Sequence, residues 1–161
     1  MSLSEMDRDA KLWMMNELYG IETIPPEEDY ETYVKATLIC AKGDGVLSPE
    51  ERAWIVGRAA VLRNPWYDFA KTYSADENLL DVIAKAQNVD QNGRRVIIYA
   101  AIKACGADGE YNQEEQQKVS DLANLLGVDL ETVGQIEQLC REEARIREER
   151  IALMFPNGIP Y

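Results

Sequence analysis

Apolar residues recur along this 161-residue chain with the three- and four-residue spacing of helix faces, and strand-like alternation is nearly absent. This spacing predicts helices over 4–19, 27–41, 48–62, 94–105, 112–126 and 129–153, with a further helix beginning near Asp76. The segment 66–73 is expected to form a short helix or an aromatic turn. We therefore predict an all-α fold, a single-domain bundle of about seven or eight helices spanning residues 1–161.

Two of the predicted helices, 48–62 and 94–105, are apolar nearly all round, which is typical of central, buried elements. The three cysteines, Cys40, Cys105 and Cys140, also lie in apolar helical stretches, and none has CxxC spacing. We expect them to be buried free thiols of a cytoplasmic protein, and we expect no cysteine-bound zinc.

One eight-residue pattern occurs twice. DGVLSPEE at 44–51 returns as DGEYNQEE at 108–115, and predicted helices flank both copies. An internal repeat of this kind predicts two pseudo-symmetric halves, at about 27–62 and 92–126, each built as helix, Asp-Gly turn and helix.

Helix capping accounts for much of the repeated pattern. Ser48 is a good N-cap, and Glu51 stands three residues later, where the partner in a capping box stands. Asn112 and Glu115 take the same places in the second copy. Because each cap stabilises a helix by roughly 0.5–2 kcal/mol, the sequence alone leaves a purely structural interpretation of both turns open.

The same residues also support a metal site. Each copy matches the second half of a calcium-binding EF-hand loop, in which glycine makes the sharp turn and the final glutamate binds the ion. The first half of the loop is missing, and Ca²⁺ takes about 6–8 oxygens, so one copy alone would bind weakly. Lys42 disfavours metal binding at the first copy, and Glu110 makes the second copy the better candidate for a metal site. The candidate ligands, for calcium or magnesium rather than zinc, are Asp44, Glu51, Asp108 and Glu115.

The charge balance narrows the range of partners. The formal net charge is −12, which disfavours binding to nucleic acid or to anionic lipid and favours divalent cations or basic protein surfaces. No residue is histidine, so histidine-based nucleophilic catalysis and imidazole metal ligation are excluded, and we expect no enzyme. The sequence shows neither a secretory signal pattern nor an apolar run long enough to insert into a membrane.

Two further functions, DNA binding and catalysis, find little support in the sequence. The segment 122–139 has the spacing of a DNA-binding helix-turn-helix, but its second helix would present acidic residues where phosphate contacts need lysine or arginine. We interpret it as a corner between two helices. Catalysis by the carboxylate pairs Glu50-Glu51 and Glu114-Glu115 lacks a nearby nucleophile.

The stretches LICAKGDGVLSPEE at 38–51 and AIKACGADGEYNQEE at 101–115, followed by LANLLGVD at 122–129, resemble the TerB-like family of tellurite resistance proteins. The resemblance covers residues 30–138 or so. It implies an all-helical fold of two halves, a role beside tellurite and chemical-stress genes, and divalent metal bound near a membrane-associated protein partner. The positions it carries over are Asp44, Gly45 and Glu51 with Asp108, Gly109 and Glu115. Lys42 and Pro49 depart from the family's more uniform acidic pattern.

These observations lead to one hypothesis and one alternative. The hypothesis is a non-enzymatic, TerB-like protein of tellurite resistance or chemical-stress response that binds a divalent metal through its acidic turns. The alternative is a protein-interaction scaffold whose Asp-Gly turns are only structural. The sequence indicates no particular oligomeric state.

Overall fold

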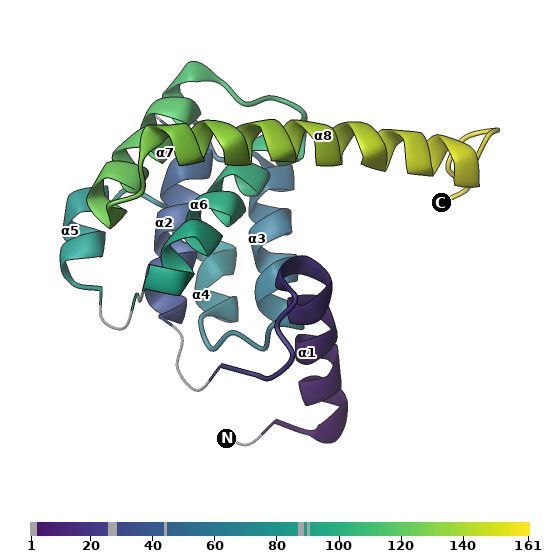
Figure 1. Cartoon of the computed structure of the whole chain (residues 1–161), viewed down its shortest axis with the longest axis horizontal. Helices are drawn as coiled ribbons and strands as arrows, with labels where there is room; N and C mark the ends of the chain where they lie inside the picture. The colour runs from purple at the N-terminus through teal and green to yellow at the C-terminus, as the bar shows by residue number, and fades with distance from the viewer. Residues whose placement is uncertain (1–2, 26–28, 44, 87–88, 90) are drawn as a thin grey trace.

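The computed structural model describes residues 3–25, 29–43, 45–86, 89 and 91–161 (Figure 1). Within these ranges the chain is all-α, as predicted, with eight α-helices, one 3₁₀ helix and no strand. The elements are α1 (Glu5–Tyr19), α2 (Tyr30–Lys42), α3 (Pro49–Val61), α4 (Tyr67–Thr72), α5 (Leu79–Ala84), α6 (Gln91–Cys105), η1 (Gly106–Asp108), α7 (Gln113–Leu126) and α8 (Leu130–Met154).

Helices α2 and α6 pack against each other at the centre, and the other helices surround them (Figure 1). Helix α2 is buried along most of its length, and α6 is buried mainly from Ile97 to its end. The prediction of a central place for 94–105 is therefore confirmed. Small side chains such as Ala36, Ala101 and Ala104, all fully buried, allow the two helix backbones to approach closely.

The prediction that 48–62 is a central helix is wrong. Only one face of α3 is buried, and that face carries Glu51, Ile55, Arg58 and Ala59. Ala53 lies on the solvent side. Small apolar residues are common on exposed helix faces, so their number alone does not show that a helix is central.

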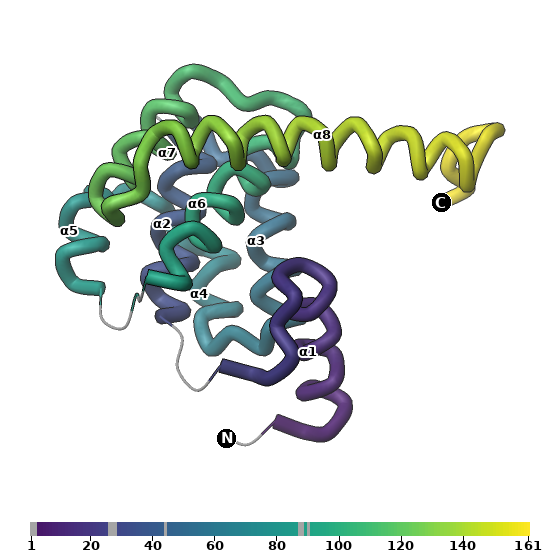
Figure 2. The backbone as a smooth tube through the Cα atoms, viewed as in Figure 1, coloured from purple at the N-terminus to yellow at the C-terminus, as the bar shows by residue number. Residues whose placement is uncertain are grey.

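Helix α8 leaves the body of the molecule. Val133 and Cys140 are its buried residues, and Glu143 still reaches Lys103 of α6, with 3.0 Å between Oε2 and Nζ. Beyond that point the helix projects away, and the C-terminus lies far from the N-terminus (Figure 2). No helix in the described part of the chain is both long enough and apolar enough to cross a membrane.

The helix predicted to begin near Asp76 begins three residues later. Ala75 has a φ of 59°, which a helix cannot continue, and Asp76 forms an ion pair with Lys42. Asn78 then caps α5, its Oδ1 accepting from the N–H of Leu80 at 2.8 Å. All three cysteines are buried free thiols, as predicted.

Candidate functional site

The first Asp-Gly turn joins α2 to α3. The chain turns after α2 at Gly43, whose φ of 58° favours glycine. Ser48 Oγ accepts from the N–H of Glu51 at 3.1 Å, and Glu51 Oε1 accepts from the N–H of Ser48 at 3.2 Å. The predicted capping box is therefore present. Asp44, one of the four predicted ligands, lies outside the described residues.

The second turn joins α6 to α7 through η1. Asp108 Oδ1 accepts from the N–H of Glu110 at 3.0 Å, which forms an Asx-turn. Asn112 Oδ1 accepts from the N–H of Glu115 at 2.9 Å and caps α7. Glu115 Oε1 accepts from Asn112 Nδ2 at 2.8 Å, so this glutamate returns to the cap through the side chain instead of the backbone.

The two turns lie against each other, although the sequence predicts one site in each. A Cβ added to Gly43 in the first turn would lie 3.3 Å from Glu114 Cβ and 3.4 Å from the backbone nitrogen of Glu115. In return, η1 of the second turn packs against α3. Each turn therefore contacts the helix that follows the other turn. This arrangement gathers Glu51, Asp108 and Glu115 into one neighbourhood, which we call the turn pair.

Two glutamates of the turn pair are buried. Glu51 is 2% exposed and Glu115 is 3% exposed. One oxygen of each carboxylate serves the helix cap, but the Oε2 atom of each is buried with no hydrogen-bond partner among the described residues. An ionised oxygen without a partner is costly to bury. Each Oε2 atom thus provides a vacant acceptor for a proton or a cation.

The carboxylates of the turn pair also act on one another. Burial, together with the negative charges of Glu51 and Asp108, raises the pKa of Glu115 from its ordinary value of 4.5 to about 7. Burial raises the pKa of Glu51 as well, with Asp108 adding to the effect and the Ser48 cap opposing it. The turn pair is therefore a place where negative charge is held close together and gains from neutralisation.

Buried thiols adjoin this charge. Burial raises the pKa of Cys105, and Cys40, Glu115 and Glu51 raise it in the same direction. Burial likewise raises the pKa of Cys40. Both thiols therefore stay protonated, whereas zinc and copper bind the thiolate. Carboxylate oxygens are the ligands left, and calcium and magnesium prefer them.

The fit to a divalent cation rests on the vacant Oε2 atoms of Glu51 and Glu115, with Asp108 at the exposed edge of the turn pair. Within the described residues, no three acidic or cysteine side chains enclose a metal ion by themselves. A cation here would take further oxygens from water, as magnesium usually does.

Lys42, whose charge disfavours metal binding at the first turn, forms its contacts with another segment. Its Nζ forms an ion pair with Asp76 and donates to the carbonyl of Ser74 at 3.1 Å. The lysine is thus bound to the segment before α5, and this contact reduces the objection to metal at the first turn.

The proposed helix-turn-helix segment forms a corner between α7 and α8. Gly127 ends α7, and Asp129 caps α8 by accepting from the N–H of Thr132 at 2.8 Å. Arg94 Nη1 donates to the carbonyl of Leu126 at 3.1 Å, so a basic residue of α6 stabilises the end of α7.

Sequence reasoning missed two buried cations, Lys11 and Arg58. Arg58 lies on the inner face of α3, in helical register with Ile55 and Glu51, and is 6% exposed. That spacing was a signal for an inward-facing arginine. Arg58 borders a cavity between helices.

Comparison with known proteins identifies the family. No protein-family model matches the chain, and no curated protein matches it either. Among solved structures, the chain is similar to a tellurite resistance protein of Nostoc punctiforme, with 39% sequence identity and a TM-score of 0.81. The similarity covers 99% of this chain and 100% of that one. The chain therefore belongs to the TerB-like family of tellurite resistance proteins.

Proposed function

We propose that the protein acts in tellurite resistance as a non-enzymatic protein that binds a divalent cation at the turn pair. Membership of the family and the solved relative named as a tellurite resistance protein support the tellurite role. The vacant Oε2 atoms of Glu51 and Glu115 support the cation.

The cation would be held by Glu51 and Glu115, with Asp108 and the sequence-predicted Asp44 as further ligands. It would supply positive charge where burial and neighbouring carboxylates raise the pKa of both glutamates. Calcium or magnesium suits these oxygen ligands, and the protonated thiols of Cys40 and Cys105 do not favour zinc.

Binding would couple two parts of the fold. Glu51 belongs to the first turn of α3, and Glu115 belongs to the first turn of α7. A cation shared by them would hold the starts of both helices together and stabilise the folded state by mass action. The cytoplasmic location expected from the cysteines and the membrane-associated protein partner expected from the family resemblance belong to the same proposal.

The side chains near the turn pair support the non-enzymatic part of the proposal. The chain has no histidine. Ser48 is committed to its helix cap, and the thiols of Cys40 and Cys105 are buried and protonated. No activated nucleophile adjoins the turn pair among the described residues.

The scaffold alternative has one specific observation in its favour. Helix capping explains Oε1 of Glu51 and Oε1 of Glu115, since each of these atoms has a partner in the cap. Capping leaves both Oε2 atoms unexplained, which is why we prefer the cation.

Survival of a tellurite-sensitive host tests the proposal. Cells producing the wild-type protein should tolerate several-fold more tellurite than cells with an empty vector. The double variant Glu51→Gln/Glu115→Gln should lose most of this protection. The control Glu50→Gln/Glu114→Gln makes the same charge change at adjacent exposed positions and should keep it.

Each outcome tests a different part of the proposal. Absence of protection by the wild type, produced in folded form, would reject the tellurite role. Full protection by a folded Glu51→Gln/Glu115→Gln variant would reject the cation and favour the scaffold alternative.

A further inference from the structure

A cavity of about 470 Å³ lies between α1, the start of α2, the end of α3 and the start of α6. Sites for small molecules typically enclose about 300–1,000 Å³, so its size is that of a ligand site. None of its lining residues belongs to the turn pair, and it is independent of the proposed cation.

The walls of the cavity are mainly apolar. Helix α1 contributes Met14, Met15 and Leu18, and Leu62 after α3 and Ile97 of α6 also line the cavity. Leu18 is 40% exposed, which places it where the cavity opens to solvent. Such walls accept a hydrocarbon chain and give no hydrogen bonds to a small inorganic ion.

A buried cation lies at one side of these walls. The guanidinium of Arg58 stands 5.4 Å from the ring centre of Tyr19 and 5.6 Å from those of Tyr33 and Trp54. Arg58 Nη2 donates to the Tyr19 hydroxyl, but Arg58 Nε is buried and has no hydrogen-bond partner among the described residues. Arginine stays charged at every physiological pH, so an unpartnered N–H of this group is a strong donor.

Two further donors border the same cavity. Asn64 is 4% exposed, and its Oδ1 accepts from the N–H of Trp66 at 2.8 Å. This bond fixes the amide so that Nδ2 is the remaining group, and Nδ2 is buried without a partner among the described residues. The Tyr33 hydroxyl is also buried and lies beside the Arg58 guanidinium. Burial raises its pKa, so it keeps its proton, and that proton has no acceptor among the described residues.

Among the described residues, no carboxylate contacts Arg58. Its described partners are aromatic rings and the hydroxyls of Tyr19 and Tyr33. Aromatic faces stabilise a buried guanidinium, yet an anion stabilises it more strongly where water is excluded. Three groups with an unused N–H or O–H beside apolar walls therefore match an anionic head joined to an apolar tail.

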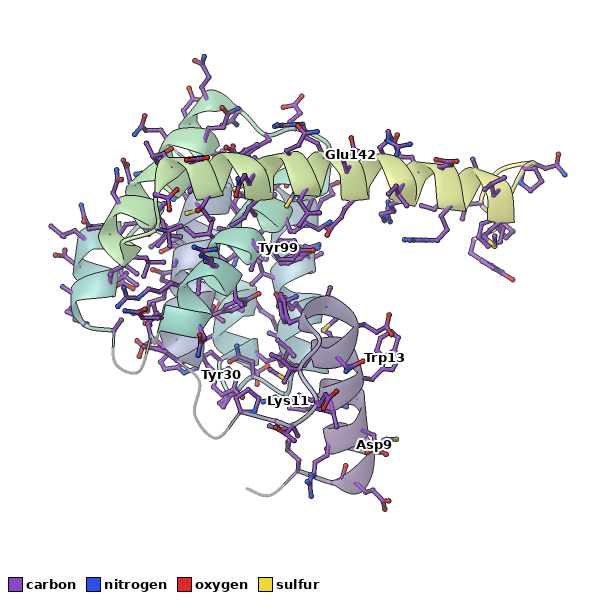
Figure 3. The ribbon with its side chains drawn as sticks, in the orientation of Figure 1. Asp9, Lys11, Trp13, Tyr30, Tyr99 and Glu142 are labelled. Carbon is purple, nitrogen blue, oxygen red and sulfur yellow. The ribbon has the colours of Figure 1, made fainter. Side chains whose placement is uncertain are left out.

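We propose that this cavity binds a medium-chain organic carboxylate. Its carboxylate accepts hydrogen bonds from Arg58 Nε, Asn64 Nδ2 and the Tyr33 hydroxyl, and its hydrocarbon tail lies against Met14 and Leu18 of α1. Lys11 of α1 donates to the Tyr30 hydroxyl, and the two side chains lie side by side (Figure 3). This contact ties α1 to α2 beside the cavity and keeps the wall in place.

Calorimetric titration with decanoate, decan-1-ol and acetate tests the proposal. The wild type should bind one decanoate per chain, bind decan-1-ol at least tenfold more weakly, and give no detectable heat with acetate. Arg58→Gln should lose the preference for decanoate over decan-1-ol. Leu18→Trp keeps Arg58 but fills the opening, so it should weaken binding of both ligands at least tenfold.

Arg63→Gln is the matched control, because Arg63 lies just beyond the same helix, pairs with Asp7 and does not line the cavity. It should retain the wild-type preference. Equal affinity of the wild type for decanoate and decan-1-ol would overturn the proposal, as would an equal loss of preference in Arg63→Gln and Arg58→Gln. If Arg58→Gln fails to fold, the Nε–H NMR signal of Arg58 in the wild type decides. It should shift with decanoate and not with decan-1-ol, and an unmoved signal would overturn the proposal.

Discussion

At the scale of single residues, Glu51 and Glu115 each combine two roles. One carboxylate oxygen completes a helix cap, which sequence spacing predicted because caps depend on residues three apart. The other oxygen is buried without a partner among the described residues. Burial depends on which helices pack over the side chain, so no local pattern could reveal it. The same reason explains why Arg58 was missed.

Replacement of Glu115 by the neutral residue glutamine separates these two roles. In the absence of metal and at a pH above 7, Glu115→Gln removes a buried charge and keeps an oxygen for the cap. We expect its free energy of unfolding to rise by about 1 kcal/mol, which raises Tm by roughly 2–4 °C for a chain of this size. Thermal unfolding with a chelator present measures the change. Glu114→Gln, at an exposed position, should stay within about 0.5 kcal/mol of the wild type, and a clear loss of stability in Glu115→Gln would contradict the account.

The raised pKa of Glu115 also predicts how stability depends on pH. Between its ordinary value of 4.5 and about 7, the folded state holds this proton more often than the unfolded state does. The free energy of unfolding of the metal-free protein should therefore fall as pH rises through that window. Urea unfolding at several pH values measures it. Glu115→Gln should show a shallower fall, and identical pH profiles for both proteins would refute the assignment.

At the scale of elements, helix type was predictable and helix position was less so. The boundaries of α1, α3 and α7 follow Ser4, Ser48 and Asn112, which are local caps visible in the sequence. The start of α5 was misplaced because an ion pair with distant Lys42 holds Asp76 outside the helix. The central position of α2 and α6 depends on how the helices pack. The apolar sequence of α3 therefore predicted a central position that α3 does not have.

Loss of the first cap should affect both fold and site. Ser48→Ala removes the acceptor for the N–H of Glu51, so we expect a loss of about 1 kcal/mol in the free energy of unfolding together with weaker cation binding. Ser4→Ala is the control, since Ser4 caps α1 by accepting from Asp7 N–H, far along the chain from the turn pair. It should lower stability and leave cation affinity unchanged. Equal effects of both variants on cation affinity would show that the cap does not position Glu51.

At the scale of the whole molecule, the sequence repeat predicted two similar turns but not their contact. Only the packing of α3 on η1, and of Gly43 on the start of α7, unites Glu51, Asp108 and Glu115. Such a contact joins residues far apart in the chain and leaves no trace in local spacing. The family resemblance, which the solved relative confirms, predicted more of the fold than the helical periodicity alone.

The projecting end of α8 should be dispensable for folding. Residues 145–161 lie beyond the last contact of α8 with α6, and Arg145 pairs only with Glu142 and Glu149 of its own helix among the described residues. A chain ending at Ala144 should unfold within about 2 °C of the full chain. Calorimetric unfolding of both chains measures the difference, and a much larger drop in Tm would show that this end of α8 stabilises the core.

The stoichiometry of cation binding tests the central claim, that two turns form one site. Calorimetric titration with Ca²⁺ and with Mg²⁺ should give one bound ion per chain for at least one of them. Glu51→Gln and Glu115→Gln should each abolish that binding, whereas Glu50→Gln/Glu114→Gln should leave it unchanged. Two ions bound independently, each removed by a different variant, would contradict the single site, and no heat from the folded wild type would contradict the cation itself.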